Sequence, residues 1–167
     1  EIEYMTIFNK ERLTNEVFKI DIKRMRRGWY SDKYFENIGV MLSSLAEKGY
    51  LFKGNALRLS DVDLSNTEVG NLEVEMQWFT RRHGKVVIAG VDKALTMLKH
   101  CSGYFKDDGK FVNTWNMLQV EAVHDGASVT YNGDPSSIQP VIRVRGRYRD
   151  FALLETPTLG LLTRSTR

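Results

Sequence analysis

The sequence predicts an α+β fold made of antiparallel strands and a few helices. Three observations indicate this class. Residues 72–80, LEVEMQWFT, alternate apolar and polar side chains, as a half-buried antiparallel strand does. Apolar side chains recur at helical spacing within residues 34–45 and 91–98. Between residues 100 and 150, short apolar runs are separated by glycine-containing turns, which is typical of strands.

The first third of the chain is expected to be helical. Residues 9–28, NKERLTNEVFKIDIKRMRRG, have loosely helical apolar spacing and predict a helix or helical turn. Ser31 or Asp32 can begin the next helix, because either side chain can accept a hydrogen bond from the free N–H groups of its first turn. Gly49 is expected to end that helix. Its predicted buried stripe consists of Tyr34, Ile38, Met41, Leu42 and Leu45.

The rest of the chain is expected to contain mostly short strands. Residues 50–71 are rich in turn-forming residues and predict a hairpin or a loop insertion before the strand at 72–80. The elements expected after that strand are, in order, a turn at 81–85, a short buried strand at 86–90, a helix at 91–100, a turn at 107–110, a strand at 115–123, a short strand between two glycine turns at 124–135, a strand at 140–149 and a helix at 150–167.

The two ends of the sequence suggest a piece of a longer protein. The first residue is not methionine, and the helical pattern at the other end stops without a capping glycine or a polar tail. We therefore expect a fragment or a processed piece.

Composition excludes several classes of protein. The 167 residues are 42% hydrophobic, which is enough to bury a core. No apolar run approaches the roughly 18 residues of a membrane span, and no secretory pattern is present, so a cytoplasmic location without membrane contact is expected. Cys101 is the only cysteine, which excludes an internal disulfide framework. The net charge of +3 suits an anionic ligand but is small for a nucleic-acid-binding composition.

The tripeptide Asp92-Lys93-Ala94 is also found at the lipoyl attachment site of acyl-carrier domains. In those domains the lysine lies at the tip of a tight hairpin. Here Leu95 and Leu98 follow at helical spacing and predict that Lys93 lies on a helix. A carrier domain modified at Lys93 is therefore the least favoured of the functions considered.

Arginines occupy alternate positions of the last predicted strand, while its apolar side chains point the other way. Together with RMRRGW and RRHGK, this row could bind RNA, because arginine neutralises phosphate and stacks on bases. It could also bind the phosphates of a small substrate or pair with a neighbouring subunit. A solvated strand face is the commonest role of such a row. The arginines of the row are Arg143, Arg145, Arg147 and Arg149.

No complete catalytic motif can be found in the sequence. It contains no nucleophile and base at a recognisable spacing, no Gly-x-Gly-x-x-Gly and no phosphate-binding loop. Asp107-Asp108 and His124-Asp125-Gly126 are typical of turns. No metal site is predicted.

Four segments, taken in order, resemble the amino-terminal domain of the nicotinate and quinolinate phosphoribosyltransferase family, and within it the nicotinate enzymes. Each segment is weak by itself, whereas their order and spacing over most of the chain are specific. The segments are YSDKYF at 30–35, GVDKALTMLK at 90–99, LQVEAVHDGASVTYNGDP at 118–135 and LLETPTLGLLTRST at 153–166.

The resemblance implies a two-part design. Residues 1–150 would form an α/β hammerhead-like amino-terminal domain that covers the substrate, and residues 151–167 would begin an irregular α/β barrel. In this family the enzyme is a homodimer, and the amino-terminal domain of one chain covers the barrel mouth of the other. The resemblance therefore implies active sites at a subunit interface.

The family's Ser/Thr-Asp-x-Tyr motif matches residues 31–34, and its tyrosine stacks on the pyridine ring of the substrate. The resemblance implies this role for Tyr34, with Asp32 beside it at the start of a helix. Such stacking contributes on the order of 1 kcal/mol beyond area burial. The alternative is that Tyr34 only begins the buried stripe of its helix.

Glu155-Thr156 stands where the quinolinate enzymes have Glu-Arg, whose arginine binds the second carboxylate of that substrate. Threonine cannot pair bidentately with a carboxylate, so this departure points to a monocarboxylate such as nicotinate. The alternative is an ordinary helix start, with Thr156 as the cap and Pro157 at the first helical position.

The family reaction joins nicotinate to phosphoribosyl pyrophosphate and gives nicotinate mononucleotide in NAD salvage. The resemblance implies Mg²⁺ and ATP for the complete enzyme, both bound outside this chain, and no activity for the chain alone. Arg143, Arg145, Arg147 and Arg164 are candidates for phosphate or interface contacts. The alternative function is a non-enzymatic RNA- or anion-binding module that uses the Arg143–Arg149 strand face.

Overall fold

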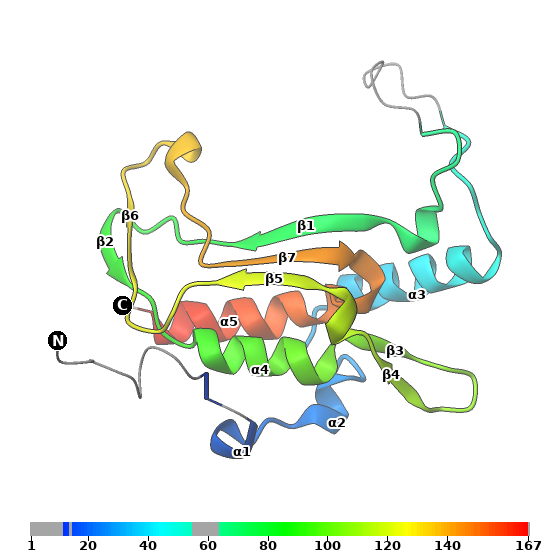
Figure 1. Ribbon diagram of the computed structural model, residues 1–167, viewed down its shortest axis with the longest axis horizontal. Coiled ribbons are helices and arrows are strands. Elements are labelled where there is room, and N and C mark those ends of the chain that lie inside the picture. Colours follow the sequence, from blue (N-terminus) through cyan, green and yellow to red (C-terminus); the bar gives the residue numbers. More distant parts are fainter. Residues whose placement is uncertain (1–11, 14, 55–63, 167) are drawn as a thin grey trace, which may run out of the picture.

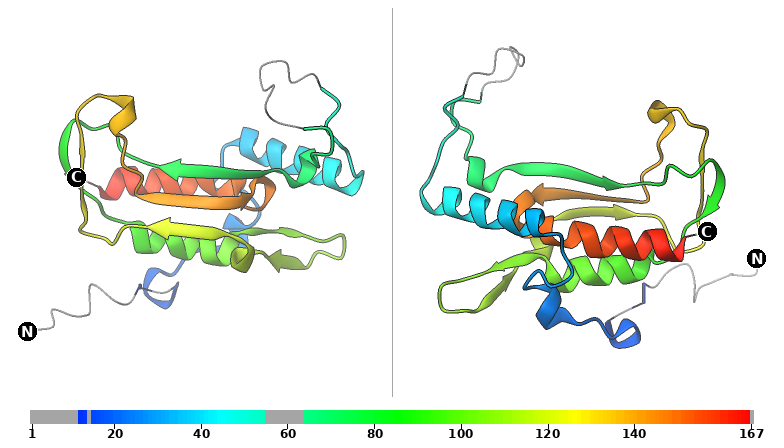
Figure 2. Two further views of the ribbon diagram at one scale, coloured as in Figure 1. Left: turned by 45° about the horizontal axis from the view of Figure 1, so that its top comes forward. Right: turned by 180° about the vertical axis from the view of Figure 1, so that it is seen from behind.

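The computed structural model describes residues 12–13, 15–54 and 64–166. Its centre is an antiparallel sheet, and two helices, α4 and α5, pack side by side on one face of that sheet (Figures 1 and 2). The opposite face of the sheet carries mostly polar and charged side chains. The predicted α+β class with antiparallel strands is confirmed.

The main sheet has three strands in the order β1-β7-β5. Strand β7 (Ile142–Arg147) lies between β1 (Glu73–Trp78) and β5 (Gln119–Ala122), and both pairings are antiparallel. The register places Glu75 opposite Arg145. The alternation predicted for the first of these strands is confirmed, because its polar residues are exposed and its apolar residues face the helices.

Two smaller ribbons extend from this sheet. Strand β2 (Gly84–Val87) pairs with β6 (Ser128–Tyr131), so the strand predicted at 86–90 begins two residues earlier and ends at an exposed Val87. Strands β3 (Gly103–Phe105) and β4 (Phe111–Asn113) form a hairpin around the predicted turn. The sequence predicted that turn but not the two strands beside it.

Helix α4 (Val91–Cys101) is confirmed, and its first turn is fixed by a side chain from a distant turn. The carboxylate of Asp125 accepts hydrogen bonds from the backbone N–H groups of Val91 at 2.8 Å and Asp92 at 3.1 Å. These are N–H groups that a helix start leaves without a partner. Lys93 lies within this first turn and not at a hairpin tip, as the helical spacing predicted.

Helix α3 (Lys33–Glu47) begins and ends close to the predicted positions, but its predicted buried stripe is confirmed only in part. Phe35 and Leu42 are buried, whereas Tyr34 and Met41 are exposed. The prediction that Tyr34 and Met41 belong to the stripe was therefore wrong. Neighbouring positions on a helix differ by about 100°, so a second aromatic residue next to Tyr34 can take its place in the core.

The expected helix over residues 9–28 is two short helices in the described part of that range. Helix α1 (Asn15–Phe18) and helix α2 (Ile22–Met25) are separated at Lys19, which has a φ of 51°. A left-handed residue cannot continue a right-handed helix. Arg26 then holds this segment on α4, because its Nε and Nη2 atoms donate to the carbonyl of His100 at 2.9 and 2.7 Å.

The excursion between α3 and β1 is closed at its neck. Leu51 forms an isolated antiparallel bridge with Glu68, and the 3₁₀ helix η1 (Val69–Asn71) follows. Gly70 packs so closely on α3 that an added Cβ would lie 2.1 Å from the backbone N of Ala46. Part of the insertion predicted over residues 50–71, namely residues 55–63, lies outside the described residues.

Helix α5 (Glu155–Ser165) packs against α4 and shares the core of the sheet. The indole N–H of Trp78 donates to the hydroxyl of the fully buried Thr158 at 2.9 Å, which joins the helix to β1. The domain boundary expected at residue 150 stays a prediction. Four further 3₁₀ helices complete the described part of the chain, namely η2 (Trp115–Met117), η3 (Pro135–Ser137), η4 (Tyr148–Asp150) and η5 (Ala152–Leu154).

Candidate functional site

The first turns of α3 and α5 meet at Asp32 and Thr156, which are 124 positions apart in the sequence. The backbone N–H of Asp32 donates to the Thr156 hydroxyl at 3.2 Å. The same hydroxyl donates to the Asp32 carboxylate, also at 3.2 Å. This reciprocal pair brings together two of the predicted site residues and fixes one helix start against the other.

Asp32 is the N-cap residue of α3, but its carboxylate makes no capping hydrogen bond. The expectation that Ser31 or Asp32 caps the helix with its side chain was therefore wrong. The Asp32 carbonyl accepts from the N–H of Phe35 at 3.0 Å, and the carboxylate turns to Thr156 instead. An aspartate that could stabilise its own helix is thus used for a contact with another element.

Thr156 is the second residue of α5 and not its cap, because the helix begins at Glu155 and has Leu154 at the N-cap position. Pro157 is accordingly the third helical residue and not the first. Proline is tolerated there because N–H groups of the first turn have no intrahelical acceptor. The interpretation of Thr156 as an ordinary helix cap was wrong.

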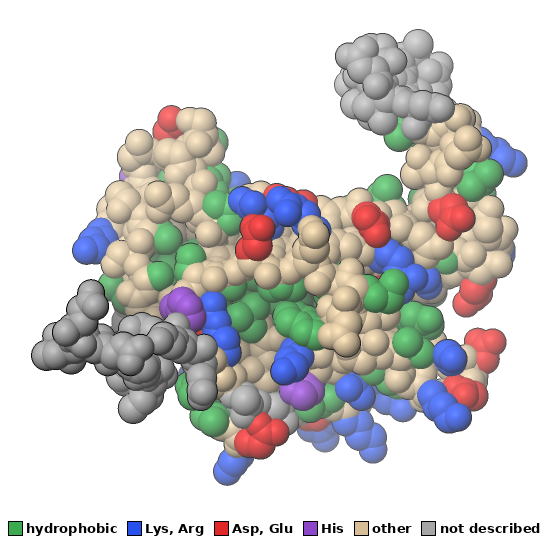
Figure 3. Space-filling model, in the orientation of Figure 1, with side chains coloured by type: hydrophobic (Ala, Val, Ile, Leu, Met, Phe, Trp, Pro, Cys, Tyr) green, Lys and Arg blue, Asp and Glu red, His purple; other side chains and the backbone are tan. Residues whose placement is uncertain are grey.

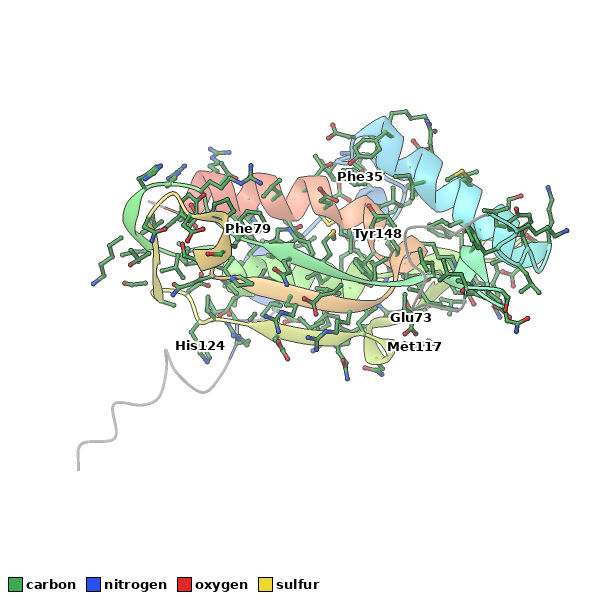
Figure 4. The ribbon with its side chains drawn as sticks, turned by 90° about the horizontal axis from the view of Figure 1, so that it is seen from above. Phe35, Glu73, Phe79, Met117, His124 and Tyr148 are labelled. Atoms are coloured by element: carbon green, nitrogen blue, oxygen red, sulfur yellow. The ribbon has the colours of Figure 1, made fainter. Side chains whose placement is uncertain are left out.

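Tyr34 lies two residues after Asp32 and projects from the surface, with 57% of its area exposed. Its ring contacts the ring of the buried Phe35, with the two centroids 4.0 Å apart. Figure 4 shows Phe35 on α3 and Tyr148 at the end of β7, on the side of the molecule where α5 begins. Tyr34 is therefore an accessible aromatic group next to the Asp32–Thr156 contact.

Three groups around this point have a raised pKa, namely Tyr34, Glu155 and Tyr148. Partial desolvation raises the pKa of Tyr34, and the nearby carboxylates of Glu155 and Asp32 raise it further. Burial also raises the pKa of Glu155, with a second contribution from Asp32. The pKa of Tyr148 is raised first by burial and then by Glu155 and Tyr34. The site therefore disfavours additional negative charge near these groups.

An open hollow of about 420 Å³ lies beside the Asp32–Thr156 contact. Arg164 supplies the one positively charged side chain in its lining. A second hollow of about 370 Å³ shares Leu159 and Thr163 with it and continues along the same side of α5. The first hollow is lined by Asp32, Phe35, Glu155, Thr156, Leu159, Gly160, Thr163 and Arg164.

The other predicted arginines lie away from this hollow, on the open face of the sheet. Arg143 pairs with Glu121 at 3.0 Å, and Arg145 pairs with Glu75. Figure 3 shows positive and negative side chains intermixed over these strands. A strand face whose charges are balanced in this way offers little net attraction to phosphate.

The arginine row is also shorter than predicted. Arg147 is its last member and pairs with the buried Asp150 at 2.8 Å. Arg149 lies in η4, where it donates to the side chain of Asn71 at 2.9 Å. The expectation that Arg149 continues the row on the strand was wrong, because the chain leaves the extended conformation after Arg147.

Tyr148 is the residue of this site that the sequence did not reveal. The strand alternation placed it opposite the arginines, on the side that faces the helices, and it is half-buried there. Nothing in the sequence indicated that it would interact electrostatically with Tyr34 and Glu155. Such a neighbourhood depends on how α3 packs against the end of β7.

Over the described residues, no group of three or more histidine, cysteine, aspartate and glutamate side chains is placed to hold a metal ion. None of the helices in the described part of the chain combines the length and the apolar character that a membrane span requires.

Comparison with known proteins gives one match to a protein family. No curated protein matches the chain. The family model described as "Quinolinate phosphoribosyl transferase, N-terminal domain" matches residues 61–166. The match covers the sheet, α4 and α5, which is more than half of the chain. The chain therefore belongs to the amino-terminal domain family of the nicotinate and quinolinate phosphoribosyltransferases.

Proposed function

We propose that the chain is the amino-terminal portion of a nicotinate phosphoribosyltransferase that acts in NAD salvage. The observation that carries this proposal is the exposed ring of Tyr34 next to the reciprocal contact between Asp32 and Thr156. The two helix starts hold an aromatic side chain at the surface without covering it. A flat, electron-poor pyridine ring is a suitable ligand for such a group.

Preference for nicotinate over quinolinate is supported by the surroundings of Thr156. Its hydroxyl carries no charge, donates its proton to the Asp32 carboxylate and accepts from the Asp32 N–H. It therefore cannot pair with a second carboxylate of the substrate as an arginine would. Asp32 and Glu155 would also repel a doubly charged ligand. Arg164 remains available in the lining of the hollow to pair with a single carboxylate.

In the proposed reaction, the pyridine nitrogen of nicotinate forms a bond to the anomeric carbon of phosphoribosyl pyrophosphate. The bond from that carbon to the pyrophosphate oxygen breaks, and pyrophosphate leaves with the electron pair. In this proposal Tyr34 orients the ring, and the Asp32–Thr156 contact holds α3 so that Tyr34 keeps its place. The chain's own residues thus contribute binding and orientation.

Mg²⁺ and ATP belong to the proposal only for the complete enzyme. The described residues offer no cluster of metal ligands. Of the two carboxylates at the site, that of Asp32 accepts a hydrogen bond from Thr156, and that of Glu155 has a pKa raised by burial and by Asp32. We therefore assign no residue of this chain to either group and derive no step through them.

The proposal also includes a cytoplasmic homodimer in which this domain covers a barrel domain of the partner chain. Tyr34 and the hollow beside α5 lie on the surface of this chain, so a second body can complete the site. Residues 151–167 would begin the barrel. The 167 residues alone are then expected to be inactive.

The test combines the chain with a barrel domain of the same family and measures pyrophosphate release from nicotinate and phosphoribosyl pyrophosphate. Tyr34→Ala should raise the KM for nicotinate about five- to tenfold, the equivalent of about 1 kcal/mol of lost stacking. Tyr50→Ala is the matched control, because Tyr50 is also an exposed tyrosine but lies beyond the other end of α3. Equal KM values for the two variants would contradict the stacking role.

Substrate preference can be tested at Thr156. Thr156→Arg restores the cation that quinolinate enzymes have at this position and should shift the ratio of kcat/KM values toward quinolinate. Thr156→Ser keeps the hydroxyl and should retain the preference for nicotinate. A wild-type protein that uses quinolinate as readily as nicotinate would overturn the proposed specificity.

A further inference from the structure

A basic and aromatic surface surrounds α2, and the proposed function does not use it. Trp29 is 70% exposed and Tyr30 is also exposed. The basic side chains near them lie at the surface, where Figure 3 shows lysine and arginine gathered along the lower edge of the molecule. We call this surface the α2 patch, and it consists of Lys19, Lys23, Arg24, Arg27, Trp29 and Tyr30.

The segment that carries the α2 patch is positively charged. Residues 15–30 include five basic and two acidic residues, an excess of three charges that equals the net charge of +3 of the whole chain. Asp21 is engaged with Arg24 at 3.5 Å and with the hydroxyl of Tyr30 at 3.0 Å. Among the described residues, no carboxylate forms an ion pair with Lys19, Lys23 or Arg27. The patch thus differs from the sheet face, whose arginines are paired.

Arginines and aromatic rings are interleaved between α2 and the β3–β4 hairpin. The guanidinium carbon of Arg24 lies 5.2 Å from the ring centre of Trp29. That of Arg27 lies 5.2 Å from the ring centre of Phe105, which is 39% exposed. Two exposed rings therefore each have an exposed arginine beside them. Arg26 is half-buried in this arrangement and anchors it, since it contacts Phe111 and the carbonyl of His100.

We propose that the α2 patch binds single-stranded nucleic acid. Exposed rings can stack on bases, and neighbouring cations that lack a carboxylate can neutralise phosphates along the strand. A membrane surface is a poorer fit, because α1 and α2 have four residues each and are too short to present a continuous apolar face. This activity would be additional to phosphoribosyl transfer and does not depend on it.

The experiment measures the fluorescence anisotropy of a labelled oligouridylate of about 12 nucleotides, a length within the usual site size, as a function of protein concentration and salt. Trp29→Ala should weaken binding about 5- to 150-fold, the range expected for one lost base stack. The double variant Arg24→Gln/Arg27→Gln should reduce the slope of log affinity against log salt by about 1.4, or roughly 0.7 for each lost phosphate contact.

The matched control is Arg81→Gln/Lys85→Gln, which removes two exposed positive charges at the far end of the sheet and leaves the α2 patch intact. Thermal unfolding should show that all variants are folded, because every substituted side chain is exposed. Absence of saturable binding by the wild-type chain at about 50 mM salt, or an equal loss in the control, would overturn the proposal. Binding to anionic vesicles without binding to the oligonucleotide would also overturn it.

Discussion

Helices α3 and α4 begin in opposite ways, although an aspartate lies at the start of each. At α4, Asp125 comes from a distant turn and accepts from two N–H groups of the first turn. At α3, Asp32 occupies the N-cap position itself and leaves the N–H groups of its own helix without a side-chain acceptor. Its carboxylate instead accepts from Thr156 of α5.

The difference separates a residue that stabilises the fold from a residue that builds a site. Asp125 satisfies backbone groups that would otherwise be buried without a partner, which contributes directly to the free energy of unfolding. Asp32 gives up a comparable contribution and holds two helices together beside an exposed tyrosine. Departures of this kind from the locally favoured arrangement are expected at functional sites.

The largest expected effect tests the α4 side of this comparison. Asp125→Ala should lower the free energy of unfolding by about 2 kcal/mol, because two N–H groups of α4 lose their acceptor. Urea denaturation measures it. Asp125→Asn, which keeps one acceptor oxygen, should lose less, and Asp32→Ala should lose only about 0.5–1 kcal/mol, because it removes one hydrogen bond from Thr156. A loss in Asp32→Ala as large as that in Asp125→Ala would remove the distinction.

A smaller effect is expected for the contact between α3 and α5. Asp32→Ala and Thr156→Val, made singly and together, should show a coupling energy of about 0.5–1 kcal/mol. Thr156→Val removes both hydrogen bonds of the pair, and Asp32→Ala removes the one that the Asp32 carboxylate accepts. Thr156→Ser retains the hydroxyl and should preserve the coupling. Strict additivity of the two losses would mean that the contact does not link the helices energetically.

The pH dependence of stability gives a further way to sharpen the comparison. Burial and the Asp32 carboxylate raise the pKa of Glu155, so the folded state favours its protonated form. Its contribution to stability is therefore full below the ordinary pKa of 4.5 and is lost as pH rises through the higher folded value. As pH rises from about 4 to about 7, the stability of Glu155→Gln relative to wild type should therefore increase.

The control for that prediction is Glu75, whose pKa is shifted in the other direction. Hydrogen bonds from Gln77 and Arg145 lower the pKa of Glu75, so its contribution is present above the ordinary value and is lost as pH falls. Glu75→Gln should therefore lose stability relative to wild type as pH rises from about 3 to about 5. The same sign for both variants would show that the surroundings of Glu155 are not as described.

The smallest effect is expected for an exposed carboxylate that belongs to neither helix start. Glu121→Gln removes an ion pair with Arg143 at 3.0 Å on the open face of the sheet. Exposed pairs of this kind contribute about 0–1 kcal/mol, and we expect under about 0.5 kcal/mol in urea denaturation. The loss of stability in this variant is the baseline that the losses in the Asp125 and Asp32 variants should exceed.

Several elements of the fold could be predicted because their patterns are local. The alternation of β1 and the helical spacing of α4 needed only the burial of one side of each element. The stripe of α3 was predicted with the wrong aromatic residue at its start, because Tyr34 and Phe35 are both aromatic and the spacing alone does not say which one is buried. The β3–β4 hairpin was missed, since three-residue strands are too short to show an alternation.

The candidate site could be predicted only in part. The sequence, through a family resemblance, singled out Asp32, Tyr34, Glu155 and Thr156, and the fold places them together. It did not predict that the Asp32 carboxylate would accept a hydrogen bond from Thr156 and not from the N–H groups of its own helix, because this depends on a neighbour 124 positions away. The pairing of the arginine row likewise depended on the strand register, which sets Glu75 opposite Arg145.

The neck between α3 and β1 has a consequence for how this domain can vary. The Leu51–Glu68 bridge and the close seat of Gly70 on α3 hold both ends of the excursion at fixed points of the framework. Segments of different length can therefore be accommodated beyond the bridge while the helix and the sheet keep their packing. This position is where the domain can acquire or lose sequence, and where a reporter peptide can be inserted with the least disturbance to Tyr34.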